Sequence, residues 1–538
     1  MASKYDLSTY LRESRIDHVR AARNLRDILE SELRQYSPKD AASLMKFLSQ
    51  ILSQLIDSSD VSERVAGIAI IDQLIDMPID KTRLSGFLRM VLPSSDPLLV
   101  SCATQAIGHL ARSTGSLIVD FVEFEARAAF TWLRQPPDKA SAQPLGEPHW
   151  RECGVKVLRA LAANAPNMLY LYMPALVEVV FPAMCDPRPE MRAQATLMLR
   201  AFMQVLRQRQ DHQRRQEEQL LMHLQQFGTP GRSDAIMLLT LGGVAAAIPA
   251  GTGDQGMALR RSLQQIAQWH FRLYDQAVSV LPPARPLGKE KPHVITGALN
   301  TLAELVRSPA CEDFLLLPLS ASTPPPATAI SLGEALASLG WGPEFPGPGA
   351  EGGPQAAGRG AERDPGNERP FEVLCALALD LLHSSTQQPI RLAALELVAL
   401  LAQHTPGRFA PVWLGPAMAQ VTAMLHARKD GPERVAALRT LGVLALALGP
   451  GAISGALLQP ALLWVREVLA AGKKRHGPAL WQEALTCVAR LAEGLPGLME
   501  AEVPAMLDKL FAEPPSEPLV EARLHGPGIA FPAQPCLA

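Results

Sequence analysis

Aromatic residues make up only 5% of the 538-residue chain, and charged residues only 19%. The two signs of charge nearly cancel, since 51 Lys and Arg stand against 53 Asp and Glu and leave a formal net charge of −2. This balance argues against a nucleic-acid binder, because such proteins gain affinity by neutralising phosphates with an excess of basic side chains. Hydrophobic residues reach 48%, enough for an extended core, so wholesale disorder is excluded.

Paired cysteines are also missing. The seven cysteines are widely scattered and none stands in a Cys-x-x-Cys pair, so the spacing suits neither a zinc site nor a disulfide framework. We expect a reducing compartment and predict a cytoplasmic protein, with any attachment to endomembranes made through partners. The cysteines are Cys102, Cys153, Cys185, Cys311, Cys375, Cys487 and Cys536.

A secretory signal and a membrane span are not predicted. The first 30 residues carry charges every few positions and have no apolar core. The best membrane candidate is Leu441–Val465, which contains no charge, but Gly449-Pro450-Gly451 and Pro460 divide it. Each piece is shorter than the roughly 20 residues that a span requires. We predict two buried helices joined by a turn, and no integral membrane segment.

Helical spacing dominates the chain, and alternating strand patterns are essentially missing. Between residues 46 and 55 the apolar positions follow the three- and four-residue step of an amphipathic helix, at Phe47, Leu48, Ile51, Leu52 and Leu55. The sequence therefore predicts an all-α fold.

One phrase recurs along the chain: a turn with Asp or Pro, then a basic residue, then small and apolar residues at helical spacing. Neighbouring phrases are mostly about 36 to 55 residues apart, a period typical of HEAT and armadillo repeats. We predict an α-solenoid of stacked HEAT-type helical hairpins, an armadillo-like superhelix. The phrases begin at Ser58, Ser94, Glu147, Cys185, Gly231, Lys289, Gln387, Lys429 and His476.

Each part of the phrase has a physical reason. Aspartates can accept hydrogen bonds from free N–H groups at a helix start, as expected for Asp60, Asp96, Asp186 and Asp430. Proline suits a turn or the first helical position, as expected for Pro97, Pro187, Pro389 and Pro432. Small residues let a paired helix approach to roughly 8–10 Å, as expected for Ala66, Ala103, Ala195, Ala394 and Ala437.

Four segments are expected. Residues 1–317 form an N-terminal HEAT-repeat solenoid, which continues over residues 371–523 after an insert. The insert, residues 318–370, is more than one-third Gly and Pro and is predicted to be a flexible loop. Residues 524–538 hold no helical pattern and are predicted to be a disordered or truncated tail.

Catalytic motifs are not apparent. The segment Gly251–Gly256 formally matches G-x-G-x-x-G, but a helix is expected before it rather than a strand, so a helix–helix turn is the better interpretation. Phosphate-loop, zinc-protease, nucleophile-elbow and protein-kinase signatures are absent. The twelve histidines are dispersed, and His109 and His223 are expected at helix flanks rather than as metal ligands. We predict no catalytic, cofactor-binding or metal-binding residues and no cofactor.

Two basic runs could contact acidic partners or serve as import signals. Arg207–Arg215 continues a helix beyond Phe202, and Lys473–His476 is expected in a turn. A solvated helix end and a solvated loop are the more ordinary interpretations.

From Ser58 onward the sequence resembles the amino-terminal HEAT region of the target of rapamycin (TOR) serine/threonine kinases, members of the PI3K-related kinase family. The resemblance is dense from about residue 50 to 200 and patchy from 370 to 525, where RVAALRTLGVLALAL at Arg434 looks similar. It is carried by Ser58-Ser59-Asp60 with Glu63-Arg64, Leu92-Pro93-Ser94 with Asp96-Pro97, Ala106-Ile107-Gly108, Val122-Glu123-Phe124-Glu125, Trp132-Leu133, and Asp186-Pro187 with Met191-Arg192.

The resemblance implies a protein-interaction scaffold in nutrient and growth signalling. In TOR kinases this region docks a raptor-type adaptor and supports a dimeric complex. Later helical domains, the rapamycin-binding domain and the kinase domain have no counterpart in these residues, so we expect no enzyme activity of this chain, although a full-length parent would be a kinase. The alternative is a free-standing HEAT-repeat adaptor, such as an importin-type transport receptor or a phosphatase scaffold subunit.

Overall fold

The computed structural model describes residues 17–77, 80–92, 94–113, 118–135, 150–227, 268–282, 290–308, 369–426, 431–500 and 502–504, with the single residues 13 and 315. Every regular element in these ranges is a helix, and no strand occurs among them. The predicted all-α class is confirmed. The described helices fall into two compact units, one holding those up to Phe227 and the other those from Pro292 onward.

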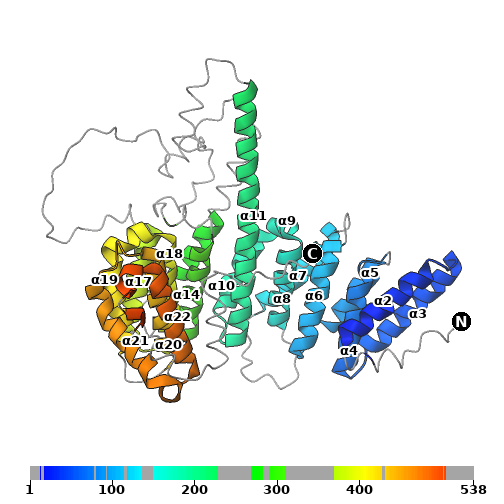
Figure 1. Cartoon of the computed structure of the whole chain (residues 1–538). Coiled ribbons are helices and arrows are strands. Elements are labelled where there is room, and N and C mark those ends of the chain that lie inside the picture. Colours follow the sequence, from blue (N-terminus) through cyan, green and yellow to red (C-terminus); the bar gives the residue numbers. More distant parts are fainter. Residues whose placement is uncertain are drawn as a thin grey trace. The chain divides into compact units, whose positions relative to one another are not determined.

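The first unit is a double layer of helices (Figure 1). One layer contains every second helix, since α4 packs on α2 and α6, and α8 packs on α6 and α11; α3, α5, α7 and α10 form the opposite layer. In chain order the elements are α2 (His18–Leu33), α3 (Pro38–Ile56), α4 (Val61–Leu74), α5 (Lys81–Val91), α6 (Pro97–Ser113), α7 (Ile118–Arg134), α8 (Trp150–Asn164), α9 (Pro166–Leu169), the 3₁₀ turn η2 (Tyr170–Tyr172), α10 (Met173–Met184) and α11 (Pro189–Phe227).

The second unit has the same plan. One layer stacks α14, α18, α20 and α22 in that order, and the opposite layer stacks α17, α19 and α21. The elements are α14 (Pro292–Arg307), α17 (Pro370–Ser384), α18 (Gln388–His404), α19 (Pro406–Leu425), α20 (Pro432–Leu448), α21 (Gly455–His476), α22 (Pro478–Gly494) and α23 (Pro496–Met499). Stacked hairpins in two layers are the predicted solenoid architecture.

The repeated phrase marks one layer in both units. Its copies become α4, α6, α8 and α11 in the first unit and α14, α18, α20 and α22 in the second. We call this layer, which also includes α2, the repeat layer. The phrase at Gly231 lies outside the described residues.

The predicted helix starts are confirmed where they are described. Asp60 accepts a hydrogen bond from the Ser62 N–H at 2.9 Å, and Asp96 accepts one from the Leu99 N–H at 2.9 Å. Pro97 and Pro432 open α6 and α20. The five predicted contact alanines (Ala66, Ala103, Ala195, Ala394 and Ala437) are fully buried. Asp430 lies outside the described residues.

The uncharged stretch from Leu441 to Val465 forms the end of α20 and the start of α21, separated by a turn at Gly449, whose φ is +68°. The prediction of two helices joined by a turn is confirmed. Among the described residues, one stretch, Pro166–Met184, is long and apolar enough to cross a membrane by length and composition. It comprises α9, η2 and α10, and α10 packs against α7 and α11, which is also the setting of an ordinary core helix.

The remaining segment predictions lie mostly beyond what the structure describes. Within the predicted insert only residues 369 and 370 are described, and α17 begins at Pro370. The predicted tail, residues 524–538, lies outside the described part of the chain. Both remain predictions from composition.

Close packing within the repeat layer requires glycine at the end of α22. A Cβ atom added to Gly494 would lie 2.4 Å from the backbone oxygen of Ala445 in α20. Because that neighbour is backbone, one of the two helices would have to move.

We expect Gly494→Ala to lower the free energy of unfolding by about 1–3 kcal/mol, the usual cost of overpacking. Gly407→Ala in α19 is the control, because its added Cβ meets no atom within 4 Å and alanine favours helix. Urea unfolding of both variants tests this. Equal losses would contradict the close approach of α20 and α22.

Candidate functional site: a polar ladder along the repeat layer

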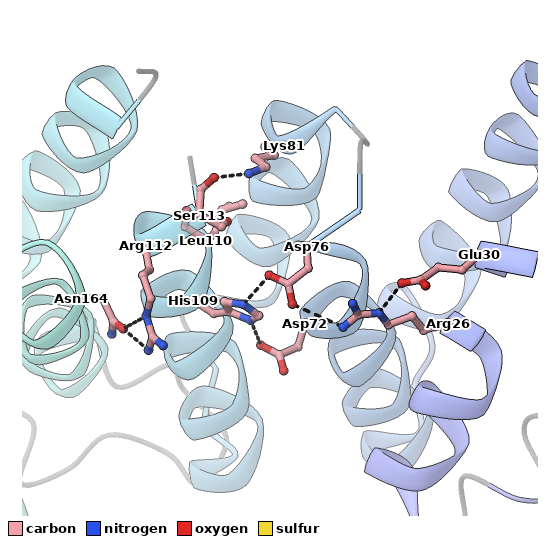
Figure 2. A network of polar contacts seen from close by, with 10 residues as sticks. All are labelled: Arg26, Glu30, Asp72, Asp76, Lys81, His109, Leu110, Arg112, Ser113 and Asn164. Carbon is pink, nitrogen blue, oxygen red and sulfur yellow. Dashed lines mark hydrogen bonds and ion pairs between the residues drawn. The ribbon is translucent and has the colours of Figure 1, made fainter. Parts of the chain in front are cut away.

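Polar side chains join neighbouring helices of the repeat layer in the first unit (Figure 2). Arg26 of α2 lies 3.4 Å from Asp76, in the turn just after α4, measured from Nη1 to Oδ2. Arg112 of α6 donates two bonds to Asn164 Oδ1 of α8, at 3.1 and 2.6 Å. The next junction, from α8 to α11, is made by Arg159 and Gln194 at 3.3 Å. We call this series the polar ladder.

The junction between α4 and α6 is made by a histidine. His109 Nδ1 lies 3.0 Å from Asp72 Oδ1, and its Nε2 lies 3.1 Å from Asp76 Oδ1. Asp72 lies in the last turn of α4 and Asp76 lies two residues beyond its end at Leu74, and the imidazole ring is held between the two carboxylates (Figure 2). Sequence reasoning placed His109 at a helix flank but did not find these partners, which are 33 and 37 residues away.

The second unit has the same kind of polar contacts between neighbouring helices of its own repeat layer, and we include them in the polar ladder. Arg307 of α14 pairs with Glu396 of α18. Arg391 of α18 lies 3.5 Å from Glu433 of α20, and Arg439 of α20 lies 3.0 Å from Glu483 of α22. In each of these pairs the arginine belongs to the earlier helix and the acid to the next one.

A buried ion pair fixes the junction before α11. Arg151 of α8 lies 2.6 Å from Asp186, and their side chains are 6% and 0% exposed. Asp186 also accepts a bond from the Arg188 N–H at 3.0 Å, while Arg192 donates to the Asp186 and Pro187 carbonyl oxygens. Asp186 therefore closes the turn before α11 and joins it to α8.

The opposite layer of the first unit exposes apolar side chains. Arg89 of α5 pairs with Glu125 of α7 at 2.6 Å, and its guanidinium lies 3.7 Å from the centroid of the Phe124 ring. Burial raises the pKa of the Glu125 carboxyl, and Arg89 opposes this shift. Phe124 itself is 52% exposed. Met90, which follows Arg89 in the sequence, is 55% exposed. Leu171 of η2 is 66% exposed.

The two basic runs lie on helices. Residues 207–215 belong to α11, as expected, where Arg207 pairs with Asp211 and Arg209 lies over the Tyr170 ring. The run Lys473–His476 was expected in a turn. It instead forms the last turn of α21, after a break at Gly472, whose φ is +69°. Glycine absorbs the change of direction there, so the helix resumes.

Other predicted features do not assemble into a chemical site. Gly251–Gly256 lies outside the described residues. His223 lies in α11. In the described part of the chain, no three His, Cys, Asp or Glu side chains are grouped as metal ligands would be.

The described cysteines are not joined in disulfide bonds: Cys102, Cys153, Cys185, Cys375 and Cys487. Burial raises the pKa of Cys153 to about 11 and that of Cys487 to about 12. Thiols with such pKa values are poor nucleophiles at neutral pH.

Comparison with known proteins identifies relatives over most of the chain. The Serine/threonine-protein kinase TOR of Arabidopsis thaliana is 23% identical over 503 residues, covering 92% of this chain and 15% of the relative. The Serine/threonine-protein kinase tor1 of Schizosaccharomyces pombe is 32% identical over 195 residues, covering 35% of this chain and 8% of the relative. The chain is similar to the TOR kinases.

The TOR similarity therefore concerns a small part of those proteins, since the chain spans 8 to 15% of the length of these relatives. No family model matches the sequence. Among solved structures, Kap121p bound to Pho4p is similar at a TM-score of 0.47 and 12% identity, covering 96% of this chain and 44% of that one. Importin beta reaches a TM-score of 0.42 at 13% identity, covering 94% and 59%.

The residues that carry the TOR resemblance mostly stabilise the fold. Ser58 donates a hydrogen bond to Glu63 at 2.7 Å next to the cap made by Asp60. Trp132 packs against Trp150 with ring centroids 5.5 Å apart and the ring planes tilted by 56°. Phe124 differs, because its ring is exposed where a structural role would bury it.

We expect Asp186→Ala to lower the free energy of unfolding by about 3–5 kcal/mol, because removing one partner leaves the buried Arg151 charge without it. Glu178→Ala is the control. It breaks the Arg134–Glu178 ion pair, whose atoms are 3.2 Å apart and whose side chains are 55% and 58% exposed, and should cost no more than ~1 kcal/mol. Chemical denaturation compares the two. Losses of the same size would show that Asp186 is not a buried anchor.

Proposed function

We propose that this chain is a protein-interaction scaffold, the amino-terminal HEAT region of a TOR-like serine/threonine kinase that acts in nutrient and growth signalling. The observation that carries the proposal is the pairing of similarity to TOR kinases with a two-layer stack of hairpins. Such stacks offer long continuous surfaces on which partners bind across several repeats. We place the chain in the cytoplasm, with contacts to endomembranes made through partners.

The proposed partner is a raptor-type adaptor that docks on the opposite layer of the first unit. Phe124 supports this surface, since Arg89 holds its ring in place while half of the side chain stays exposed. A large, rigid ring loses little conformational freedom on binding, and aromatic side chains are common binding hot spots. In this role the kinase activity belongs to other parts of the longer protein.

A pull-down with a raptor-type adaptor tests the scaffold. We expect the 538-residue chain to retain the adaptor and Phe124→Asp to weaken retention by about tenfold, because the charge would have to be desolvated in the interface. Val412→Asp is the matched control, since Val412 of α19 is similarly exposed, at 61%, but lies in the second unit.

Three outcomes would contradict the proposal. Equal retention of both variants would remove Phe124 from the interface. Failure to retain the adaptor, combined with selective binding of a Ran-type GTPase, would favour a free-standing importin-type receptor. Phosphoryl transfer by the purified chain that persists through stringent purification would show an enzyme instead of a scaffold.

A further inference from the structure

The two ring nitrogens of His109 both face acceptors. A carboxylate only accepts hydrogen bonds, so Asp72 and Asp76 can both be satisfied only when each ring nitrogen carries a proton. That state is the imidazolium cation. A neutral ring would turn a lone pair toward one of the two carboxylates, at a distance of about 3 Å.

The remaining charges near the junction are already engaged. Arg26 of α2 lies behind Asp76 and also pairs with Glu30 at 2.9 Å. On the other sides of α6, Lys81 of α5 donates to the Ser113 carbonyl oxygen, Glu125 of α7 pairs with Arg89, and Asn164 of α8 accepts from Arg112. Cys102, also on α6, is a further titratable group close to Asp72: burial, and then the charge of Asp72, raises the pKa of its thiol.

We propose that His109 is a pH-sensitive latch between α4 and α6, closed when the ring is protonated and loosened when it loses that proton. Loss of the proton removes one hydrogen bond and leaves Asp72 and Asp76 without the cation between them. The two carboxylates are then four residues apart at the C-terminal end of α4, on the side that faces His109, and like charges at this spacing repel.

The direction of the pH dependence follows from the site. Hydrogen bonding to Asp72 raises the pKa of His109 above its ordinary value of 6.5, and the charges of Asp72 and Asp76 add to this, while burial acts against it. Because the folded pKa is raised, the contribution to stability is complete below about pH 6.5. It is lost as the pH rises through the folded-state pKa, on the alkaline side of 6.5.

The latch acts at a single place among the described junctions of this layer. The other junctions in the first unit depend on Arg26, Arg112 and Arg159, and a guanidinium keeps its charge throughout this range. A change of pH near neutrality therefore loosens the contact between α4 and α6 and leaves the neighbouring contacts intact. The pair of helices would act as a hinge within the unit.

Hydrogen exchange of the full chain tests the latch. After correction for the intrinsic pH dependence of exchange, we expect the amides of α4 and α6 to exchange about threefold faster or more at about pH 9 than at about pH 6, while those of α8 change little. In His109→Gln this difference should disappear. His383→Gln is the matched control, because His383 is exposed on α17 and has one hydrogen bond, to Gln420 at 3.4 Å.

A second variant keeps the test decisive if His109→Gln does not fold. Asp76→Asn retains an oxygen acceptor but removes one charge, so the midpoint of the pH dependence should move to lower pH. Exchange of α4 and α6 that does not depend on pH in the wild-type chain would overturn the proposal. An unchanged pH dependence in His109→Gln would also overturn it, as would an unchanged midpoint in Asp76→Asn.

Discussion

A single hairpin of this chain cannot cover its own apolar surface, and the whole structure depends on neighbouring hairpins to do so. Leu99, Ala103, Ile107 and Leu110 are buried along α6, which packs against α4 on one side and α8 on the other. Fully buried alanines let the helices of the repeat layer come close. Stability is therefore shared between junctions, and a defect at one junction weakens the two hairpins that meet there.

Apolar packing alone does not fix how far one helix slides along the next, and the polar ladder supplies that information. Each polar contact of the ladder joins a side chain on one helix of the repeat layer to a partner on, or directly after, a neighbouring helix of that layer. Exposed contacts of this kind contribute little to the free energy of folding. Their geometry, together with the buried Arg151–Asp186 pair, selects one register among packings of similar apolar contact.

The repeat layer could be predicted from sequence because its signals are local. Caps such as Asp60, opening prolines and alanines at helical spacing all lie within one phrase. The ladder could not be predicted, because its partners lie 33 to 89 residues apart and which faces meet depends on how the helices stack. His109 shows this limit, since nothing near it in the sequence points to Asp72 or Asp76. The exposure of Phe124 likewise depends on what α5 and α7 leave uncovered.

The residues that carry the resemblance to TOR kinases are of two kinds. Most of them make caps, turns and ring contacts, so they indicate the fold more than a function. Phe124 lies in the same stretch but faces solvent. Residues of this second kind are where a scaffold can change partners without disturbing its frame.

Because each contact of the polar ladder pairs particular side chains on neighbouring helices, one hairpin of the chain cannot simply replace another. Arg26, on α2, and His109, on α6, both find their acids at the C-terminal end of α4, the helix between them, where Asp72 lies in the last turn and Asp76 just beyond it. If residues 38–76 were excised and the gap closed, an arginine would meet a histidine, with neither Asp72 nor Asp76 to separate them. Loss of this hairpin would therefore also remove the polar contacts that join its neighbours.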